Sequence, residues 1–244
     1  MTEQNKTILK QNVKALKILI SGASKGIGLF LFQKLKDDGH LVLGTYTSTK
    51  PPSEFVDFFT KVDVSDDKQV ADWVAKSVNE EDNIVLINCA SINYNVLARK
   101  AEVEKWKHLI DVNLVGTFRT INSILPQMYE KGFGRIINFS SIVAQKGIPG
   151  TSAYAASKAA LWGMAKSIAV ENAKRNITIN NINLGYFNIG MTLNDVPENI
   201  REDIKEQIPS HELGSPENIY ETVKYLIAAD YINGTSIDLN GGLF

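Results

Sequence analysis

A glycine-rich segment near the start of the chain reads Ile18-Leu19-Ile20-Ser21-Gly22-Ala23-Ser24-Lys25-Gly26-Ile27-Gly28. Its apolar beginning favours a buried β-strand, and the pattern from Ile27 to Asp37 favours a helix. Glycines between a strand and a helix permit a tight turn and let the backbone approach a pyrophosphate, which then rests on the positive helix N-terminus. We therefore expect a dinucleotide cofactor here, with contacts from Gly22, Ser24, Lys25, Gly26, Ile27 and Gly28.

The rest of the chain alternates short apolar runs with longer helical patterns. Continuous apolar strands separated by helices are typical of a parallel sheet covered on both faces. The sequence predicts a single-domain, doubly wound α/β Rossmann fold with a seven-stranded parallel sheet. The expected strands are Leu16–Ser21, Leu41–Thr45, Lys61–Val64, Ile84–Asn88, Arg135–Ser140, Ile177–Asn183 and Ser236–Leu239. The expected helices are Ile27–Asp37, Asp67–Asn79, Glu102–Glu130, Ala153–Asn172, Pro197–Gln207 and Pro216–Ala229.

Length and composition agree with one globular domain. The 244 residues suffice for one large α/β domain, and 44% hydrophobic with 22% charged residues is ordinary globular composition. The formal net charge is −1 with both signs interspersed, so we expect no nucleic-acid partner. We assign residues 16–244 to the domain and the largely polar residues 1–15 to an N-terminal extension.

The number and spacing of the cysteine and histidine residues argue against an internal disulfide and a metal site. Cys89 is the single cysteine, and the three histidines are scattered without metal-ligand spacing, so we expect no metal site. The first eleven residues lack the apolar core of a signal peptide, and the apolar runs are far shorter than the ~20 residues of a membrane span. The expectation is a soluble, cytoplasmic protein without a membrane segment.

Residues 184–213 contain two glycines and two prolines around a short helical pattern. In a doubly wound sheet this stretch follows the sixth strand at its carboxyl end, which is where ligands bind. We expect it to form a substrate lid, with an ordinary long connection as the alternative.

The end of the second strand indicates which dinucleotide is preferred. Sites that prefer NAD usually place Asp or Glu there to accept from the adenosine ribose, whereas this chain has no acid between Gly44 and Lys50. Lys25, Thr47 and Ser48 could instead bind a 2′-phosphate, which favours NADP(H). The alternative for Lys25 is an ordinary solvated loop lysine.

Two more strand ends are expected to border the cofactor. Asp63-Val64 follows the third strand, where Asp63 could accept from the adenine amine or cap the next helix. Asn88-Cys89-Ala90 follows the fourth strand, and we expect Asn88 and Ala90 to lie along the cofactor.

A proton-transfer site is indicated by Ser141, Tyr154 and Lys158. Tyr154 and Lys158 are four residues apart in an Ala-rich helical pattern and therefore share one face, while Ser141 ends a strand. A free tyrosine, with a pKa of ~10, is a poor acid or base near neutrality, and a neighbouring ammonium lowers that pKa. A serine hydroxyl can hold the oxygen of a carbonyl that is being reduced.

Other residues test how specific this pattern is. Tyr46/Lys50 and Tyr220/Lys224 have the same spacing and are interpreted as incidental surface or packing pairs. Asn113 lies inside a long helical pattern although Asn is a mediocre helix former, which suggests a local kink or a proton-relay role, with a simple polar turn as the alternative.

With these residues assembled, the chain from Lys17 to Phe244 resembles the short-chain dehydrogenase/reductase family, and within it most closely the 3-oxoacyl-acyl-carrier-protein reductases. The glycine loop resembles the cofactor motif of that family. Asn113, Ser141, Tyr154 and Lys158 match its catalytic tetrad, and the tail from Tyr231 to Gly242 is similar to its last strand.

The resemblance implies a role for each matched residue. Tyr154 would be the general acid, Ser141 would orient the carbonyl, and Asn113 would hold a relay water. Lys158 would lower the pKa of the tyrosine and, with Tyr154, contact the nicotinamide ribose. Gly185 and Phe187 would border the cofactor after the sixth strand.

The chain departs from the family pattern at several positions. Ser91 stands where the family has a glycine, Leu184 where it has a proline, and Ile189 where it has a threonine. Gly132 matches an arginine implicated in acyl-carrier-protein docking, whose companion is kept as Arg175.

These features leave three functions open. The first is NADPH-dependent reduction of an acyl-thioester ketone, with an acyl carrier protein as a possible partner. The second is the same chemistry on a keto-sugar or a secondary-metabolite ketone, and the third is a non-catalytic binding or scaffold subunit.

We also expect a homotetramer, or at least a homodimer. Two helical patterns hold more apolar residues than one sheet-facing stripe needs, and the resemblance implies that they pair across a twofold axis. Burial inside the monomer is the alternative. The residues concerned are Val112, Val115, Phe118, Leu161, Met164 and Ile168.

Overall fold

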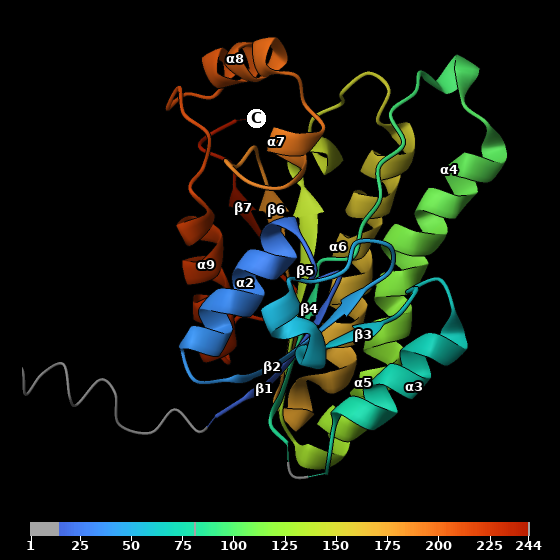
Figure 1. Ribbon diagram of the computed structural model, residues 1–244, viewed down its shortest axis with the longest axis vertical. Helices are drawn as coiled ribbons and strands as arrows, with labels where there is room; N and C mark the ends of the chain where they lie inside the picture. The colour runs from blue at the N-terminus through green and yellow to red at the C-terminus, as the bar shows by residue number, and fades with distance from the viewer. Residues whose placement is uncertain (1–14, 81, 244) are drawn as a thin grey trace, which may run out of the picture.

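The computed structural model describes residues 15–80 and 82–243, and in these ranges seven strands form one parallel sheet (Figure 1). The strand order is β3-β2-β1-β4-β5-β6-β7, so the chain winds outward in both directions from the neighbours β1 and β4. This order confirms the predicted doubly wound fold. The predicted extension, residues 1–15, lies outside the described residues except for Ala15. The strands are β1 Lys17–Ser21, β2 Leu41–Tyr46, β3 Phe59–Lys61, β4 Ile84–Asn88, β5 Gly134–Ser141, β6 Ile177–Leu184 and β7 Ser236–Leu239.

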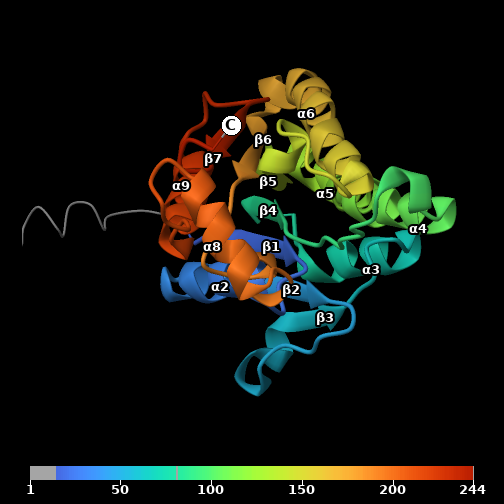
Figure 2. The same cartoon turned by 90° about the horizontal axis from the view of Figure 1, so that it is seen from above.

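Helices cover both faces of the sheet. Helices α2 and α9 pack on one face, and α3, α5 and α6 pack on the other, as the view along the strands shows (Figure 2). No helix of the described ranges is long and apolar enough to cross a membrane. The helices are α2 Gly26–Asp37, α3 Asp67–Ser77, α4 Val103–Ile110, α5 Gly116–Lys131, α6 Ser152–Asn172, α7 Met191–Asn194, α8 Glu198–Gln207 and α9 Pro216–Ala228.

The central strands are apolar on both faces because each face lies under helices. In β1, Ile18 and Ile20 belong to the core under α2 and α9, whereas Leu19 belongs to the core under α3, α5 and α6. Successive side chains of a strand point to opposite faces, so a strand covered on both sides reads as a continuous apolar run. The central strands could therefore be predicted from their continuous apolar runs.

The third strand is displaced from its predicted position. It spans Phe59–Lys61 rather than Lys61–Val64. The Phe59 ring lies 4.7 Å from the ring of Phe32 on α2, and it fills the space beside Gly44 of β2. This aromatic packing fixes Phe59 in the sheet, and the chain leaves the sheet after Val62.

The long helix predicted over Glu102–Glu130 is interrupted. Helix α4 ends at Ile110, a π-helical turn covers Asp111–Val115, and α5 then begins at Gly116. Asn113 lies in this turn with its side chain buried. The kink predicted at Asn113 is therefore confirmed, and π-helical turns are frequent at functional sites.

A row of polar side chains, buried except for the half-buried Ser236, crosses the sheet. Its members occupy the same register position on five adjacent strands, and each forms a hydrogen bond with the next. The row joins Ser21 to Asn88 at 3.3 Å, Asn88 to Asn138 at 2.9 Å, Asn138 to Asn181 at 3.2 Å and Asn181 to Ser236 at 3.0 Å. It thereby connects β1, which leads into the glycine loop, with β7.

We expect Asn138→Ala to lower the free energy of unfolding by about 2–4 kcal/mol. The substitution leaves the buried amide nitrogen of Asn88 and the buried amide oxygen of Asn181 without their partner, and each such loss costs about 1–3 kcal/mol. Urea denaturation at fixed protein concentration measures the change. Asn199→Ala on the exposed side of α8 is the matched control and should stay within about 0.5 kcal/mol. Equal stability of the two variants would contradict a structural role for the row.

Candidate active site

The glycine loop is held by close packing against the strand ends. Gly22 has a φ of 66°, and a Cβ atom built on it would come within 2.6 Å of the Ala90 Cα atom. A Cβ on Gly28 would overlap the carbonyl oxygen of Gly22. These two glycines therefore let the loop after β1, the loop after β4 and the start of α2 meet.

The N-terminus of α2 is open and positive. Lys25 caps it in an extended conformation without a side-chain hydrogen bond, and the first turn contains no acidic residue. The first N–H groups of a helix have no intrahelical partner and carry a partial positive charge, so this end suits the pyrophosphate of a dinucleotide. Ser24 lies buried beside it. The loop thus fits the cofactor that the sequence predicts.

The end of β2 contains hydroxyls and no carboxylate. Thr45 accepts from the Gly22 backbone nitrogen at 3.0 Å and so fixes the start of the glycine loop. Thr47 donates to the Val62 carbonyl oxygen at 3.0 Å, so its own proton is engaged. Ser48 and Lys25 are exposed and remain the donors that a 2′-phosphate could meet.

Asp63 and Val64 lie in the loop after β3. The Asp63 carboxylate accepts from the backbone nitrogen and the hydroxyl of Ser65, at 2.9 Å and 2.6 Å. Helix α3 is capped by Asp66, so the capping role considered for Asp63 is wrong. Val64 is buried against Gly116 of α5. An adenine contact at these two residues stays a prediction.

The loop after β4 is fixed at its first residues. Asn88 is part of the buried polar row and also accepts from the Thr120 hydroxyl of α5 at 2.7 Å. The Ala90 backbone nitrogen donates to the Ser21 hydroxyl at 3.3 Å. Asn88 therefore holds the strand end, whereas the half-buried Ala90 lies against Gly22 at the carboxyl ends of β1 and β4, where doubly wound folds bind ligands.

Tyr154 and Lys158 lie on the first half of α6, which is fastened to β5. The Lys158 ammonium donates to the Phe139 carbonyl oxygen at 2.9 Å, and the Ser140 hydroxyl donates to the Lys158 carbonyl oxygen at 2.9 Å. The ammonium nitrogen lies 5.4 Å from the centroid of the Tyr154 ring. Because Ser141 is the next residue of β5, these bonds bring the serine strand and the tyrosine helix together.

Burial is the largest influence on the pKa values of Tyr154 and Lys158. Burial raises the pKa of Tyr154 to about 12, and the neighbouring Ser91 hydroxyl partly offsets the rise. Burial lowers the pKa of Lys158 to about 8, with a smaller opposite effect of Cys89. In the protein alone the pKa of the tyrosine is thus raised and not lowered, because desolvation outweighs the opposite effect of the Ser91 hydroxyl. Tyr154 carries its proton at neutral pH.

Asn113 connects the loop after β4 with α6. Its amide oxygen accepts from the Ile92 backbone nitrogen at 2.8 Å, and its amide nitrogen donates to the Ile92 carbonyl oxygen at 2.9 Å. The same nitrogen lies 3.4 Å from the Ser157 hydroxyl, which donates to the Tyr154 carbonyl oxygen at 2.7 Å. Asn113 therefore sets the position of Ile92 relative to Tyr154.

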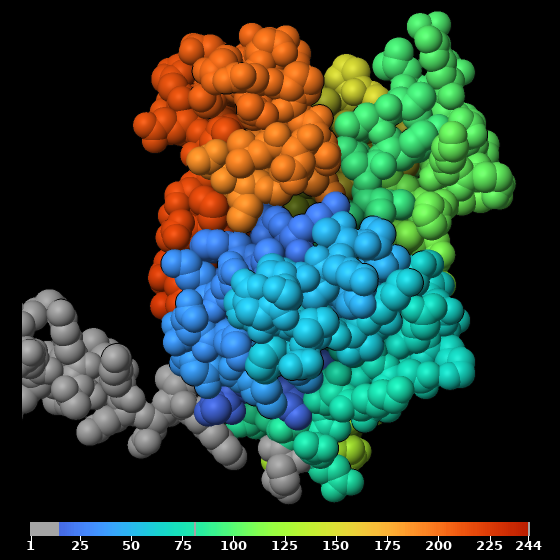
Figure 3. Space-filling view, in the orientation of Figure 1, coloured from blue at the N-terminus to red at the C-terminus, as the bar shows by residue number. Residues whose placement is uncertain are grey.

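The predicted lid lies against the glycine loop. Helices α7 and α8 belong to it, and Ile204 and Ile208 pack on Ile142 after β5. A Cβ on Gly26 would come within 3.2 Å of the Gly190 Cα atom. In the space-filling view this orange segment meets the blue surface of the first strands and helix (Figure 3). Opening and closing of the segment stays a prediction.

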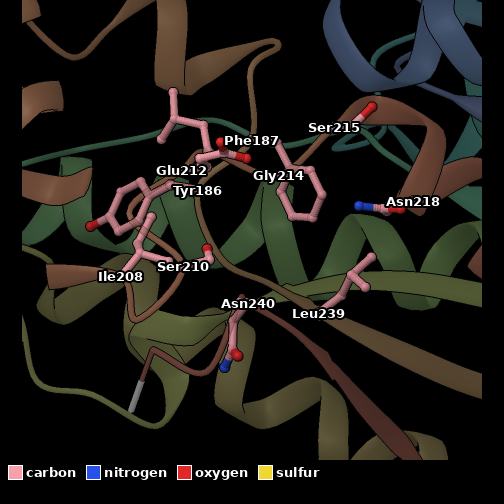
Figure 4. Close-up of a pocket in the computed structure, with 12 residues that line it drawn as sticks. Tyr186, Phe187, Ile208, Ser210, Glu212, Gly214, Ser215, Asn218, Leu239 and Asn240 are labelled. Atoms are coloured by element: carbon pink, nitrogen blue, oxygen red, sulfur yellow. The ribbon is translucent and has the colours of Figure 1, made fainter. Parts of the chain in front are cut away.

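A cavity of about 270 Å³ lies beside the same segment (Figure 4). Tyr186, Phe187 and Leu239 line it, whereas the four predicted catalytic residues do not. The Phe187 ring packs over Gly214 and is buried, so only the backbone of Phe187 is available for the cofactor contact predicted there. Gly185 is required by packing, since a Cβ on it would lie 2.7 Å from the Asn240 Cα atom.

Some residues of the site were missed by sequence reasoning. Ser157 connects Asn113 to Tyr154, and Thr45 and Ser21 fix the two loops that border the crevice. Ser21 and Thr45 share a signal, since each is a hydroxyl at or near the carboxyl end of a strand that borders the glycine loop. In the described part of the chain, no three His, Cys, Asp or Glu side chains gather as a metal-ligand set.

Comparison with known proteins agrees with this geometry. A family model for short chain dehydrogenases matches residues 16–199. The 3-oxoacyl-[acyl-carrier-protein] reductase of Staphylococcus epidermidis is 33% identical over 93% of this chain and 98% of its own length. Nodulation protein G of Azospirillum brasilense is 32% identical over 92% of this chain and 96% of its own length.

A solved structure matches as well. A tryptophan-substituted variant of actinorhodin polyketide ketoreductase with NADPH superposes with a TM-score of 0.86, at 25% identity over 94% of this chain and 97% of the other. The family match, the curated relatives and the shared sheet agree with one another. The chain belongs to the short-chain dehydrogenase family of oxidoreductases.

Proposed function

We propose that the protein is an NADPH-dependent carbonyl reductase in which Tyr154 donates the proton. The bound cofactor would supply hydride to the carbonyl carbon. Tyr154 would give its phenolic proton to the carbonyl oxygen, Ser141 would hold that oxygen, and Lys158 would hold the nicotinamide ribose and stabilise the phenolate left behind.

The observation that carries this proposal is the half-buried Tyr154 beside the Lys158 ammonium, with a pKa that keeps the phenol protonated at neutral pH. The acid of a reduction must hold its proton at working pH and release it only to the developing alkoxide. Burial keeps the pKa of Tyr154 at about 12, and the bonds of Lys158 and Ser157 fix the helix that presents the phenol. Asn113 would position a relay water near Ile92, whose backbone it already holds.

Two ketone classes remain candidates. The name of the Staphylococcus epidermidis relative points to acyl-carrier-protein thioesters, and the name of the structural neighbour points to a polyketide. The surface that would receive a carrier protein lacks one cation, because Gly132 forms the left-handed end of α5 with a φ of 67°. Arg175 is kept and lies 4.3 Å from the centroid of the Tyr129 ring. We favour a thioester ketone, with the secondary-metabolite or keto-sugar ketone as the alternative.

A ketone screen decides between these classes. NADPH oxidation would be followed with β-ketoacyl thioesters on acyl carrier protein, the same acyl groups on a small thiol, keto-sugars and aromatic polyketide mimics. A preference for the carrier-bound thioester over the small thioester supports carrier docking. Turnover of only the other ketones selects the alternative. NADPH binding by fluorescence without turnover of any ketone would instead favour the scaffold reading.

We expect Tyr154→Phe to reduce turnover by at least 10²–10⁴-fold, the usual contribution of general acid catalysis. NADPH binding should remain, because the substitution leaves the glycine loop unchanged. Steady-state kinetics and fluorescence titration measure the two effects. The matched control is Tyr220→Phe, since the Lys224 ammonium lies 4.8 Å from that ring and the pair has the same sequence spacing. Near-normal activity of Tyr154→Phe would refute the mechanism.

Cofactor preference follows from the end of β2 and from Lys25. A 2′-phosphate would meet the exposed lysine, and a charge-assisted contact of ~1.5–3 kcal/mol corresponds to roughly ten- to more than hundredfold in affinity. Lys25→Ala should weaken NADPH binding by that factor and leave NADH binding nearly unchanged. Thr47→Asp should reverse the preference, and Lys107→Ala on α4 is the control. Equal binding of NADH and NADPH by the unmodified protein at low ionic strength would show that this prediction is wrong.

Exposed apolar side chains on α5 and α6 support an oligomer. Val112, Leu161 and Ile168 are buried within the monomer, so they do not support an interface. Phe118 on α5 and Val170 on α6 remain 45% and 83% exposed, respectively. We expect a homotetramer, or at least a homodimer, in which these apolar side chains are covered. Light scattering at micromolar concentration tests this, and a 27 kDa particle would contradict it.

A further inference from the structure

Ser91 carries a buried hydroxyl that the described hydrogen bonds leave unused. Its Oγ atom is buried and has no partner at hydrogen-bond geometry among the described residues. Buried polar atoms in folded proteins are nearly always paired, and a catalytic role is one of the physical reasons for an exception. Ser91 follows Asn88-Cys89-Ala90 just beyond the carboxyl end of β4, the edge of the sheet at which doubly wound folds bind ligands.

The backbone at Ser91 does not need a glycine. Asn176 and His211 are the residues other than glycine that have positive φ in the described ranges, so Ser91 has an ordinary conformation for a residue with a side chain. A glycine at this position would therefore gain no conformational relief. The hydroxymethyl group is an addition to the site that costs no backbone strain.

The chain holds Ser91 rigidly between two anchored neighbours. Ala90 is fixed through its backbone nitrogen to Ser21, and Ile92 is fixed at both its backbone groups by Asn113. Asn113 also contacts Ser157, one turn after Tyr154 on α6. The position of the Ser91 hydroxyl relative to the tyrosine is thus set by the same amide that kinks the α4–α5 segment.

Ser91 and the Tyr154 phenol are electrostatic neighbours. The serine hydroxyl lowers the pKa of Tyr154 against the larger effect of burial. The Lys158 ammonium, on the same helix, lies 5.4 Å from the centroid of the Tyr154 ring. The half-buried Cys89 thiol at the end of β4, whose pKa is raised by burial, interacts electrostatically with that ammonium. Ser91 is therefore a nearby neutral donor that could turn toward a phenolate.

We propose that Ser91 is a positioning residue of the proton-transfer site, whose hydroxyl donates a hydrogen bond to the Tyr154 oxygen when that oxygen gives up its proton. The inference rests on the proposed function, in which Tyr154 is the donor. In reduction the O–H bond of Tyr154 breaks as a new O–H bond forms on the substrate oxygen. Ser91 then supplies a donor to the phenolate and keeps its own proton.

The test is the pH dependence of the reverse reaction. The alcohol made from the best ketone substrate would be oxidised with NADP⁺, a direction in which Tyr154 must be ionised. A hydrogen bond to an ionised group lowers its pKa by about one to two pH units. Ser91→Ala and Ser91→Gly should both move the ascending limb of log kcat/KM to higher pH by about that amount, because both lack the hydroxyl. Ser167→Ala on the exposed side of α6 is the matched control and should leave the limb in place.

The comparison of Ala with Gly separates the hydroxyl from a steric effect. A spacer role predicts that Ser91→Gly tightens NADPH binding, that Ser91→Ala does not, and that neither moves the limb. That result, or an unmoved limb with unchanged NADPH binding, would overturn the inference. Thermal unfolding of each variant establishes that it is folded.

Failure of this inference can be told apart from failure of the proposed function. If Tyr154→Phe is inactive while both Ser91 variants keep the wild-type limb, only the role of Ser91 is wrong. If Tyr154→Phe is active, Tyr154 is not the proton donor and both proposals fall together.

Discussion

The two hydrogen bonds between the Asn113 amide and the Ile92 backbone are the constraint on which the site depends. They form because the chain makes a π-helical turn at Asp111–Val115 and turns the amide inward. Together with the contact of the same amide with Ser157, they tie the loop after β4 to the helix that carries Tyr154. Without this connection, only the sheet would relate the cofactor side of the site to the proton-donating side.

The cofactor side of the site depends on positions that lack a side chain or a side-chain cap. Gly22 and Gly28 allow three backbone segments to touch, and the N-terminal end of α2 has no side-chain hydrogen bond from its capping residue, so its N–H groups stay available. An ordinary helix would gain about 1 kcal/mol from a capping side chain at this point. The chain leaves that stabilisation to a bound pyrophosphate, which couples binding of the cofactor to the stability of the loop.

The sequence predicted the fold well where periodicity and packing agree. β4 matches its predicted range because Ile84–Ile87 is a continuous apolar run, and β7 matches because Asn240 and two glycines end it. The predicted range of the third strand was wrong because the strand begins at Phe59, which packs on Phe32, a residue far away in the sequence. Periodicity cannot report such a contact.

The sequence predicted which residues form the candidate site, but it did not predict the direction of the pKa shift at Tyr154. Spacing placed Tyr154 and Lys158 on one face, and the poor helix propensity of Asn113 indicated the kink. The direction of the pKa shift at Tyr154 depends on how completely the phenol is buried, which is a property of the whole fold. Ser157 was missed because a serine inside a helix looks ordinary until its two partners are known.

The row of hydrogen bonds from Ser21 to Ser236 has a consequence for how the sheet is assembled. Apolar contacts alone tolerate a strand that slides by two residues, since the same face stays apolar. A two-residue slide at β6 would separate Asn181 from Asn138 and from Ser236 at once. In one direction the slide would bring the apolar Ile179 opposite Asn138 and leave that buried amide without its partner. The row thus helps to fix the register of parallel strands that are distant in sequence. It becomes complete only when β7 pairs with β6.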